Sequence, residues 1–295
     1  QEIFQQEGWH YELESEDAPV TINGVVYNEM KGAFSSPDDV LSRQIMTSLF
    51  PDTTYANVSG GDPLHIPELT YEEYLDFHRR YYHPCNSYIY LYGDMDVAEK
   101  LAWMDEAYLG KYEAIGLDSE IKLQKSFEKP IEVTHKYSIS STESEENNTY
   151  LSYNMVVGNA ADSQMAMAFE VLDYALLSAP GAPLKQALLD VKAGKDVYGS
   201  YDDGILQPYF TVIAKGSNPD RKEEFVSVIR QVLGDIVKNG IDRKAVEAGI
   251  NYFEFRYREA DFSSYPKGLM YSLDILGDWL YEKGNPFAQV QQLTV

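Results

Sequence analysis

Cysteine is nearly absent from this sequence of 295 residues, and long hydrophobic runs and excess positive charge are absent as well. A single cysteine, Cys85, excludes an internal disulfide and fits a reducing compartment. No run approaches the ~20 apolar residues of a membrane span, so we expect no membrane contact. The net charge of −23 repels phosphate backbones, so we expect no nucleic-acid partner, whereas basic peptides would be attracted.

The local motifs of common catalytic sites are also lacking. There is no phosphate-binding loop, and the glycines of SGGDP at residues 59–63 indicate a tight turn. The nucleophile pattern Gly-x-Ser-x-Gly is absent. No two of the five histidines have the spacing of His-Glu-x-x-His or His-x-x-Glu-His, so the chain cannot form a local zinc pair. Cys85 near His83 leaves a thiol-dependent enzyme as one alternative.

What remains is the composition of a globular protein, with 44% hydrophobic residues and a length that suggests two domains. Ser36 and Pro37 predict a helix start, and Thr70 with Glu73 forms a predicted capping box. Further helices are predicted near residues 97–108, 161–178, 183–192, 225–236, 246–257 and 269–280. Strands are predicted near residues 25–27, 88–92, 132–140, 149–157, 196–202 and 208–215.

One pattern occurs in both halves of the chain. The aromatic run at residues 88–92 leads through Gly93 to a predicted helix, and the run at 209–214 leads through Gly216 to another. The repetition predicts an α+β fold built from two related units, each a sheet with helices on one face.

Several blocks then resemble the pitrilysin/insulinase family of zinc metallopeptidases, of the presequence-protease type. The similarity extends over blocks whose order and spacing also match: GVVYNEMKGAF at residues 24–34, LFPDTTY at 49–55, SGGDP at 59–63, IPELT at 66–70 and FHRRYYHPCN at 77–86. A fainter likeness continues beyond residue 110. The resemblance implies two-layer sheet-plus-helices domains of the metallohydrolase type, the first of them incomplete.

The resemblance also implies a zinc site to which this chain contributes one residue. In the family, His-x-x-Glu-His on a helix supplies two zinc ligands and the glutamate that activates water, and a later glutamate completes the site. The later glutamate corresponds to Glu29, which the sequence places after a short strand and before a capped helix. The motif itself is missing, so we expect it, and every catalytic residue, upstream of Gln1. The alternative is that Glu29 is an ordinary surface carboxylate.

These expectations define a function and a domain arrangement. Residues 1–115 would be the later part of the catalytic domain, 116–130 a linker, and 131–295 a second peptidase-family domain. The parent enzyme would be a zinc endopeptidase of the cytoplasm or an organelle matrix that hydrolyses unfolded peptides with zinc-activated water. The fragment alone would be inactive and would hold no zinc. It would either self-associate through surface exposed by truncation or show disorder in residues 1–30. The alternative is a non-catalytic relative that keeps the fold without the metal.

Overall fold

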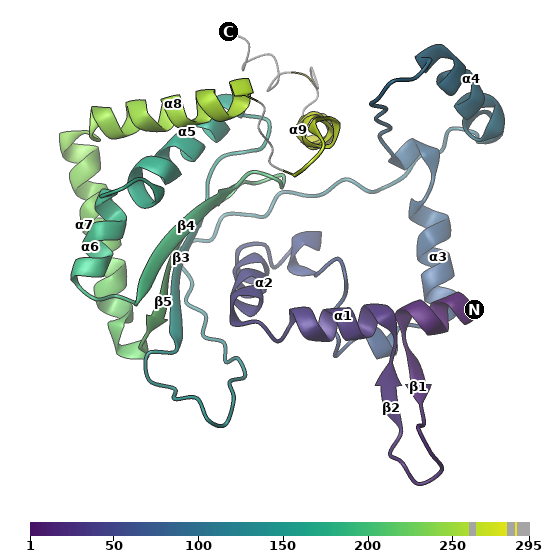
Figure 1. The fold of residues 1–295 in the computed structure, drawn as a ribbon, viewed down its shortest axis with the longest axis horizontal. Helices are drawn as coiled ribbons and strands as arrows, with labels where there is room; N and C mark the ends of the chain where they lie inside the picture. The colour runs from purple at the N-terminus through teal and green to yellow at the C-terminus, as the bar shows by residue number, and fades with distance from the viewer. Residues whose placement is uncertain (260–263, 282–286, 288–295) are drawn as a thin grey trace. The chain divides into compact units, whose positions relative to one another are not determined.

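The computed structural model describes residues 1–259, 264–281 and 287, and it divides into two compact units, Gln1–Ser138 and Ile139–Val295. Helices and small sheets combine in an α+β fold, as predicted (Figure 1). The predicted domain boundaries at 115 and 131 stay a prediction. Within the described residues, no helix is long and apolar enough to cross a membrane.

The first unit begins with a π-helical turn, a short hairpin and a helix. The turn is η1 (Phe4–Gly8), the antiparallel hairpin pairs β1 (His10–Glu12) with β2 (Thr21–Asn23), and the helix is α1 (Val25–Ala33). The predicted strand at residues 25–27 is therefore wrong, because these residues form the first turn of α1. The Asn23 side chain favours this helix start, since its Oδ1 accepts hydrogen bonds from Gly24 N–H at 2.8 Å and Asn28 Nδ2 at 2.5 Å.

Two further helices of the first unit begin where their predicted caps lie. Ser36 Oγ accepts from Asp39 N–H at the start of α2 (Pro37–Leu49), and the capping box of Thr70 and Glu73 opens α3 (Tyr71–Tyr81). The other elements are η2 (Thr54–Ala56), η3 (Ile66–Glu68), η4 (Pro84–Asn86), α4 (Val97–Ala107) and η5 (Leu109–Lys111).

Two predicted strands do not form. Residues 88–92 and 132–140 lie outside any strand. Both runs have β propensity, but a strand persists only where a neighbouring strand takes up its backbone hydrogen bonds, and the described chain offers neither run such a neighbour. In residues 1–138, all of which are described, the hairpin is the only sheet, so the predicted repeat of one sheet-and-helix unit is not seen.

The second unit is a three-stranded antiparallel sheet covered by helices. The strands β3 (Thr149–Val156), β4 (Asp196–Asp202) and β5 (Tyr209–Ser217) lie in the order β3-β5-β4. Figure 1 shows α5 to α8 on one side of this sheet. The helical elements are α5 (Ser163–Asp173), the π-helical η6 (Tyr174–Ser178), α6 (Pro183–Asp190), η7 (Pro219–Arg221), α7 (Lys222–Asn239), α8 (Arg243–Glu259) and α9 (Lys267–Tyr281).

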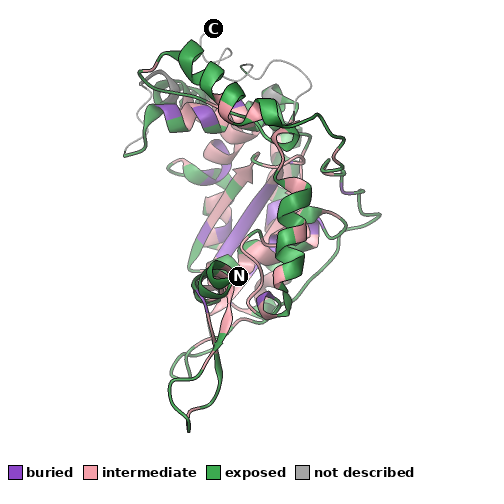
Figure 2. Cartoon of the chain, turned by 90° about the vertical axis from the view of Figure 1, so that its right-hand side faces the viewer, coloured by how far each residue is buried: buried purple, intermediate pink, exposed green. Residues whose placement is uncertain are grey.

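The core of the second unit lies between the sheet and these helices. Every second residue of β5 faces the helices, and the fully buried Val212 and Ala214 belong to the same hydrophobic core as Leu184 and Leu188 of α6. Burial is concentrated in the middle strand and the inner faces of the helices (Figure 2). The strands predicted near residues 149–157, 196–202 and 208–215 and the helices predicted after residue 160 are confirmed. The middle strand β5 is buried on both faces, since Thr211 and Ile213 are buried as well.

Candidate metal site at Glu29

Glu29 lies in the middle of α1 and not after a strand. Its side chain is exposed, and its carboxylate makes no hydrogen bond or ion pair with any residue that the structure describes. An unpaired carboxylate on a helix is available as a hard oxygen ligand for a metal ion. The same exposure also fits an ordinary surface residue, so the surroundings of α1 have to separate the two interpretations.

The beginning of α1 is fixed against the backbone of the preceding turn. Gly24 has φ +151°, and a Cβ at this position would lie 2.7 Å from Trp9 Cα and closer still to the carbonyl oxygen of Gly8. Only glycine combines this conformation with this close approach. Together with the hydrogen bonds of Asn23, this contact fixes the first turn of the helix that carries Glu29.

The five histidines do not converge on Glu29. His10 lies in β1, His65 before η3, His78 in α3, His83 before η4 and His135 in an exposed segment. No group of three or more His, Cys, Asp or Glu side chains that could hold a metal ion occurs among the described residues. Zinc sites use three or four protein ligands, so the described part of this chain supplies one candidate ligand and does not fit zinc by itself.

Cys85 and His83 do not form a nucleophile–base pair in this structure. The backbone N–H of Cys85 donates to His83 Nδ1 at 3.2 Å, and the His83 ring packs edge-on against Tyr112 at a centroid distance of 5.2 Å. The Nδ1 acceptor is therefore occupied by the backbone. The thiol is exposed, and this arrangement gives no support to a thiol-dependent reaction.

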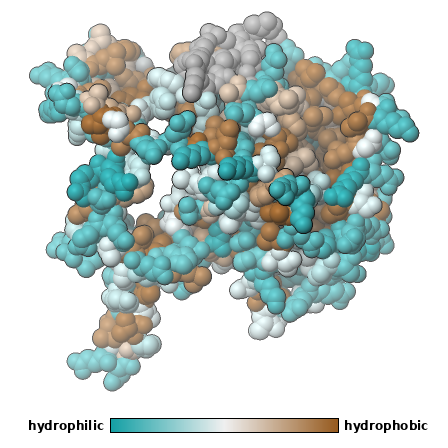
Figure 3. All heavy atoms as spheres, turned by 180° about the vertical axis from the view of Figure 1, so that it is seen from behind, coloured by the Kyte–Doolittle hydropathy of each residue, from teal (hydrophilic) through white to brown (hydrophobic). Residues whose placement is uncertain are grey.

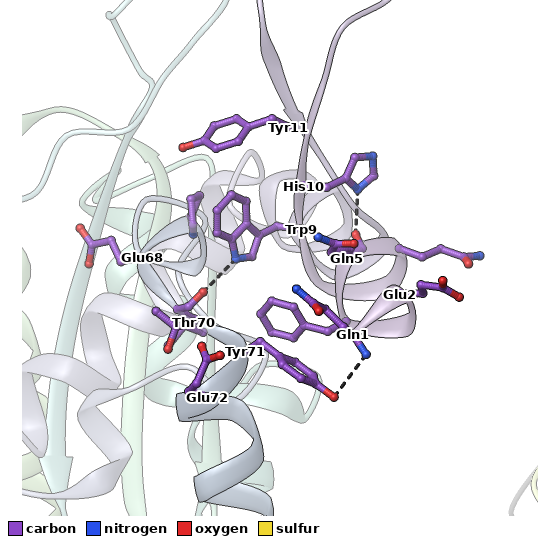
Figure 4. A pocket seen from close by; sticks show the side chains of 14 residues that line it. Gln1, Glu2, Gln5, Trp9, His10, Tyr11, Glu68, Thr70, Tyr71 and Glu72 are labelled. Carbon is purple, nitrogen blue, oxygen red and sulfur yellow. Dashed lines mark hydrogen bonds between the residues drawn. The ribbon is translucent and has the colours of Figure 1, made fainter.

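A hollow of about 930 Å³ lies near the N-terminus between η1, β1 and the start of α3. Trp9, Tyr11 and Tyr71 line it, and Trp9 Nε1 donates to the carbonyl oxygen of Leu69 at 3.2 Å (Figure 4). Glu29 is not among the lining residues. Sequence reasoning missed this hollow, because its walls come from segments about 60 residues apart.

Sequence reasoning also missed a group of carboxyl groups in the second unit. Burial, followed by the charges of Asp278 and Asp203, raises the pKa of Asp274 to about 6, and Arg256 opposes the rise. Burial also raises the pKa of Asp203. These residues come from α8, from α9 and from the position directly after β4, so no local pattern indicates that they meet. The cluster favours proton binding, and no metal-binding set is found in it.

Relatives of known sequence place the chain in a family. The family model described as the peptidase M16 inactive domain matches residues 68–253. Protein HypA of Clostridium perfringens is 48% identical over 98% of this chain and 30% of its own length. Presequence protease 1, chloroplastic/mitochondrial, of Arabidopsis thaliana is 38% identical over 96% of this chain and 26% of its own. The mitochondrial presequence protease of Xenopus laevis is 31% identical over 96% of this chain and 28% of its own length.

Solved structures agree on the fold. A peptidase M16 inactive domain from Pseudomonas fluorescens has a TM-score of 0.61 at 20% identity, covering 91% of this chain and 62% of that one. An M16-like peptidase from Alicyclobacillus acidocaldarius has a TM-score of 0.57 at 17% identity, with the same two coverages. The chain spans less than a third of the length of the curated relatives above. The predicted membership is confirmed, and the chain belongs to the peptidase M16 family.

Proposed function

We propose that this chain is an internal part of a zinc-dependent endopeptidase that hydrolyses unfolded peptides. The observation that carries the proposal is its identity of 38% and 31%, over 96% of the chain, to presequence proteases. Because the chain covers 26% and 28% of those proteins, most of such an enzyme lies outside it. A location in the cytoplasm or an organelle matrix belongs to the same proposal, since these relatives are named for mitochondria and chloroplasts.

Within this enzyme, Glu29 is one zinc ligand, and two imidazoles come from a preceding segment of the polypeptide. The exposed carboxylate on a helix with a fixed N-terminus supports this role. When bound, zinc lowers the pKa of a water molecule and polarises the scissile carbonyl group. This chain contributes the carboxylate and holds it in place. The acidic surface, with a net charge of −23, attracts basic peptide segments.

The test is Glu29→Gln in the full-length polypeptide that contains this chain. An amide is a neutral, weaker ligand, so we expect the zinc affinity to fall by more than about tenfold, together with hydrolysis of an unstructured peptide. Glu106→Gln, at an exposed position of α4, is the matched control and should change neither. A zinc affinity and an activity equal to those of the control would remove Glu29 from the site. The chain of residues 1–295 alone should hydrolyse no peptide.

A second function is favoured by the description of the matching family model, which names an inactive domain. The chain would then belong to a non-catalytic relative that binds peptides or other subunits. The match covers residues 68–253 and leaves Glu29 outside. The full-length polypeptide separates the two functions, because only the peptidase binds zinc stoichiometrically and binds it more weakly in the Glu29→Gln variant.

A further inference from the structure

Helix α1 is held in place although it has no buried residue. All of Val25–Ala33 is described, and none of these side chains is buried. Most helices are stabilised by packing of an apolar face, and a nine-residue helix is marginal without such packing. The contacts that fix α1 therefore lie outside a buried face: η1 and Gly24 meet its N-terminal end, and a glycine-rich turn meets Met30.

This turn, residues 58–63 and called here the Gly60 turn, packs directly on the residue after Glu29. The Gly61 N–H donates to the Val58 carbonyl oxygen at 2.9 Å and closes the turn. A Cβ at Gly60 would lie 3.1 Å from Met30 Cε and 3.3 Å from Cγ, and closer still to Sδ. The turn thus packs so closely on Met30 that a side chain at position 60 would displace the Met30 side chain.

The same turn also reaches the end of α1 through Arg43. Asp62 Oδ2 lies 3.4 Å from Arg43 Nη1, and the Arg43 guanidinium lies 3.5 Å from the centre of the Phe34 ring. The Phe34 N–H in turn donates to the Met30 carbonyl oxygen at 2.9 Å. Charge and ring contacts of this kind are worth more where they are partly shielded from water, as Arg43 is here.

We propose that the Gly60 turn positions Glu29. It fixes the Met30 side and the C-terminal end of α1, while Gly24 fixes the N-terminal end. Consecutive helical residues point about 100° apart, so a Met30 side chain directed at the turn leaves Glu29 free to reach a ligand. Gly60 and Arg43 are positioning residues, and this role rests on the proposed function of Glu29 as a zinc ligand.

The test is Gly60→Val in the full-length polypeptide. Gly60 does not have a φ in the left-handed region, so the substitution tests space and not backbone strain. We expect the zinc dissociation constant to rise about tenfold or more, because residues that orient a ligand typically change metal affinity by ~10–100-fold. Gly60→Ala should have a smaller effect in the same direction, since the flexible methionine can turn away from one carbon atom. The alanine variant still tests the proposal if the valine variant does not fold.

Two further variants separate positioning from general damage. Met30→Ala combined with Gly60→Val removes the collision and should restore the zinc affinity to within about threefold of wild type. Gly32→Ala lies on the same helix, with no atom of the described residues within 4 Å of the new Cβ, and should leave the affinity unchanged. An unchanged affinity in a folded Gly60→Val protein, or a loss that Met30→Ala does not rescue, would overturn the positioning role. If Glu29→Gln also keeps the zinc affinity of wild type, the proposed function itself fails.

Discussion

Asp274 in α9 carries a carboxyl group whose ionisation the fold opposes. Burial is the main cause, the charges of Asp278 and Asp203 add to it, and the attraction of Arg256 only partly compensates. The pKa is therefore about 6 in the folded protein, against an ordinary value of 3.8. Between these two values the folded protein binds the proton more tightly than the unfolded chain, so this group makes folding less favourable as the pH rises through that window.

We predict that Asp274→Asn stabilises the chain above its folded pKa of about 6 and has little effect below 3.8. The amide has nearly the shape of the protonated acid and cannot ionise, so the loss of stability with rising pH should flatten. Urea unfolding at about pH 4 and about pH 8 measures the difference. Asp235→Asn, at an exposed position of α7, is the control and should leave the pH dependence unchanged. Parallel profiles for wild type and Asp274→Asn would contradict the prediction.

Residues that act through near neighbours in the sequence were predictable, and residues that act through distant ones were not. The capping box of Thr70 and Glu73 spans three residues, and its structure is the predicted one. Asp274, by contrast, owes its pKa to residues from three elements, which only the folded chain brings together. For the same reason, sequence analysis placed SGGDP correctly in a turn but not against α1. The assignment of Glu29 to zinc came from family resemblance and stays a prediction.

Gly199 shows how one position couples a strand to a helix. It lies in β4 on the face that meets the helices, and a Cβ there would collide with Leu177 Cδ1 of η6 and with the carbonyl oxygen of Thr211 in β5. The π-helical turn can approach the sheet this closely only because the strand has no side chain at this point.

We predict that Gly199→Ala destabilises the second unit by about 1–3 kcal/mol, the usual range for overpacking a core. Gly234→Ala is the matched control on the exposed face of α7, where none of the described neighbours lies within 4 Å of the new Cβ. Alanine is the better helix former, so the control should gain up to about 1 kcal/mol. Urea unfolding followed by circular dichroism measures the stability of both variants and of wild type. A Gly199→Ala variant as stable as wild type would show that η6 moves away from the new Cβ at no cost in free energy.

Periodicity predicted elements well where both partners of a contact lie in the described chain. The strands at residues 149–157, 196–202 and 208–215 pair with one another, and their predicted positions are correct to within about two residues. The runs at 88–92 and 132–140 have similar propensity and form no strand. Residues 25–27 were predicted to form a strand because they are a short apolar, β-branched run. In the structure, the hydrogen bonds that Asn23 Oδ1 accepts from Gly24 and Asn28 stabilise the start of a helix there. β propensity shows that a segment can adopt a strand conformation, and pairing with a neighbouring strand determines whether it forms one.

At the scale of the whole molecule, the two units differ in how much they bury. The hydrophobic residues that are buried in the first unit are Ile45, Leu49, Phe50 and Ile66, whereas the second unit contains a continuous core under its sheet. Hydrophobic side chains remain at the surface over α4, where Leu101 is 54% and Trp103 64% exposed (Figure 3). An apolar surface of this kind favours association, and the net charge of −23 opposes it.

Charge repulsion acts over a longer range than apolar attraction, so a change in salt concentration distinguishes the two. The Debye length falls from ~30 Å at 0.01 M to ~10 Å at 0.1 M ionic strength, which weakens the repulsion between chains and leaves apolar contacts intact. We therefore predict that the mass of the isolated chain, measured by light scattering, rises with salt. Trp103→Glu should return it towards the monomer. Val237→Glu is the matched control, because Val237 is 87% exposed on α7, outside the first unit, and this variant should associate like wild type. A monomeric wild type at every salt concentration, or equal behaviour of the two variants, would show that the α4 surface does not drive association.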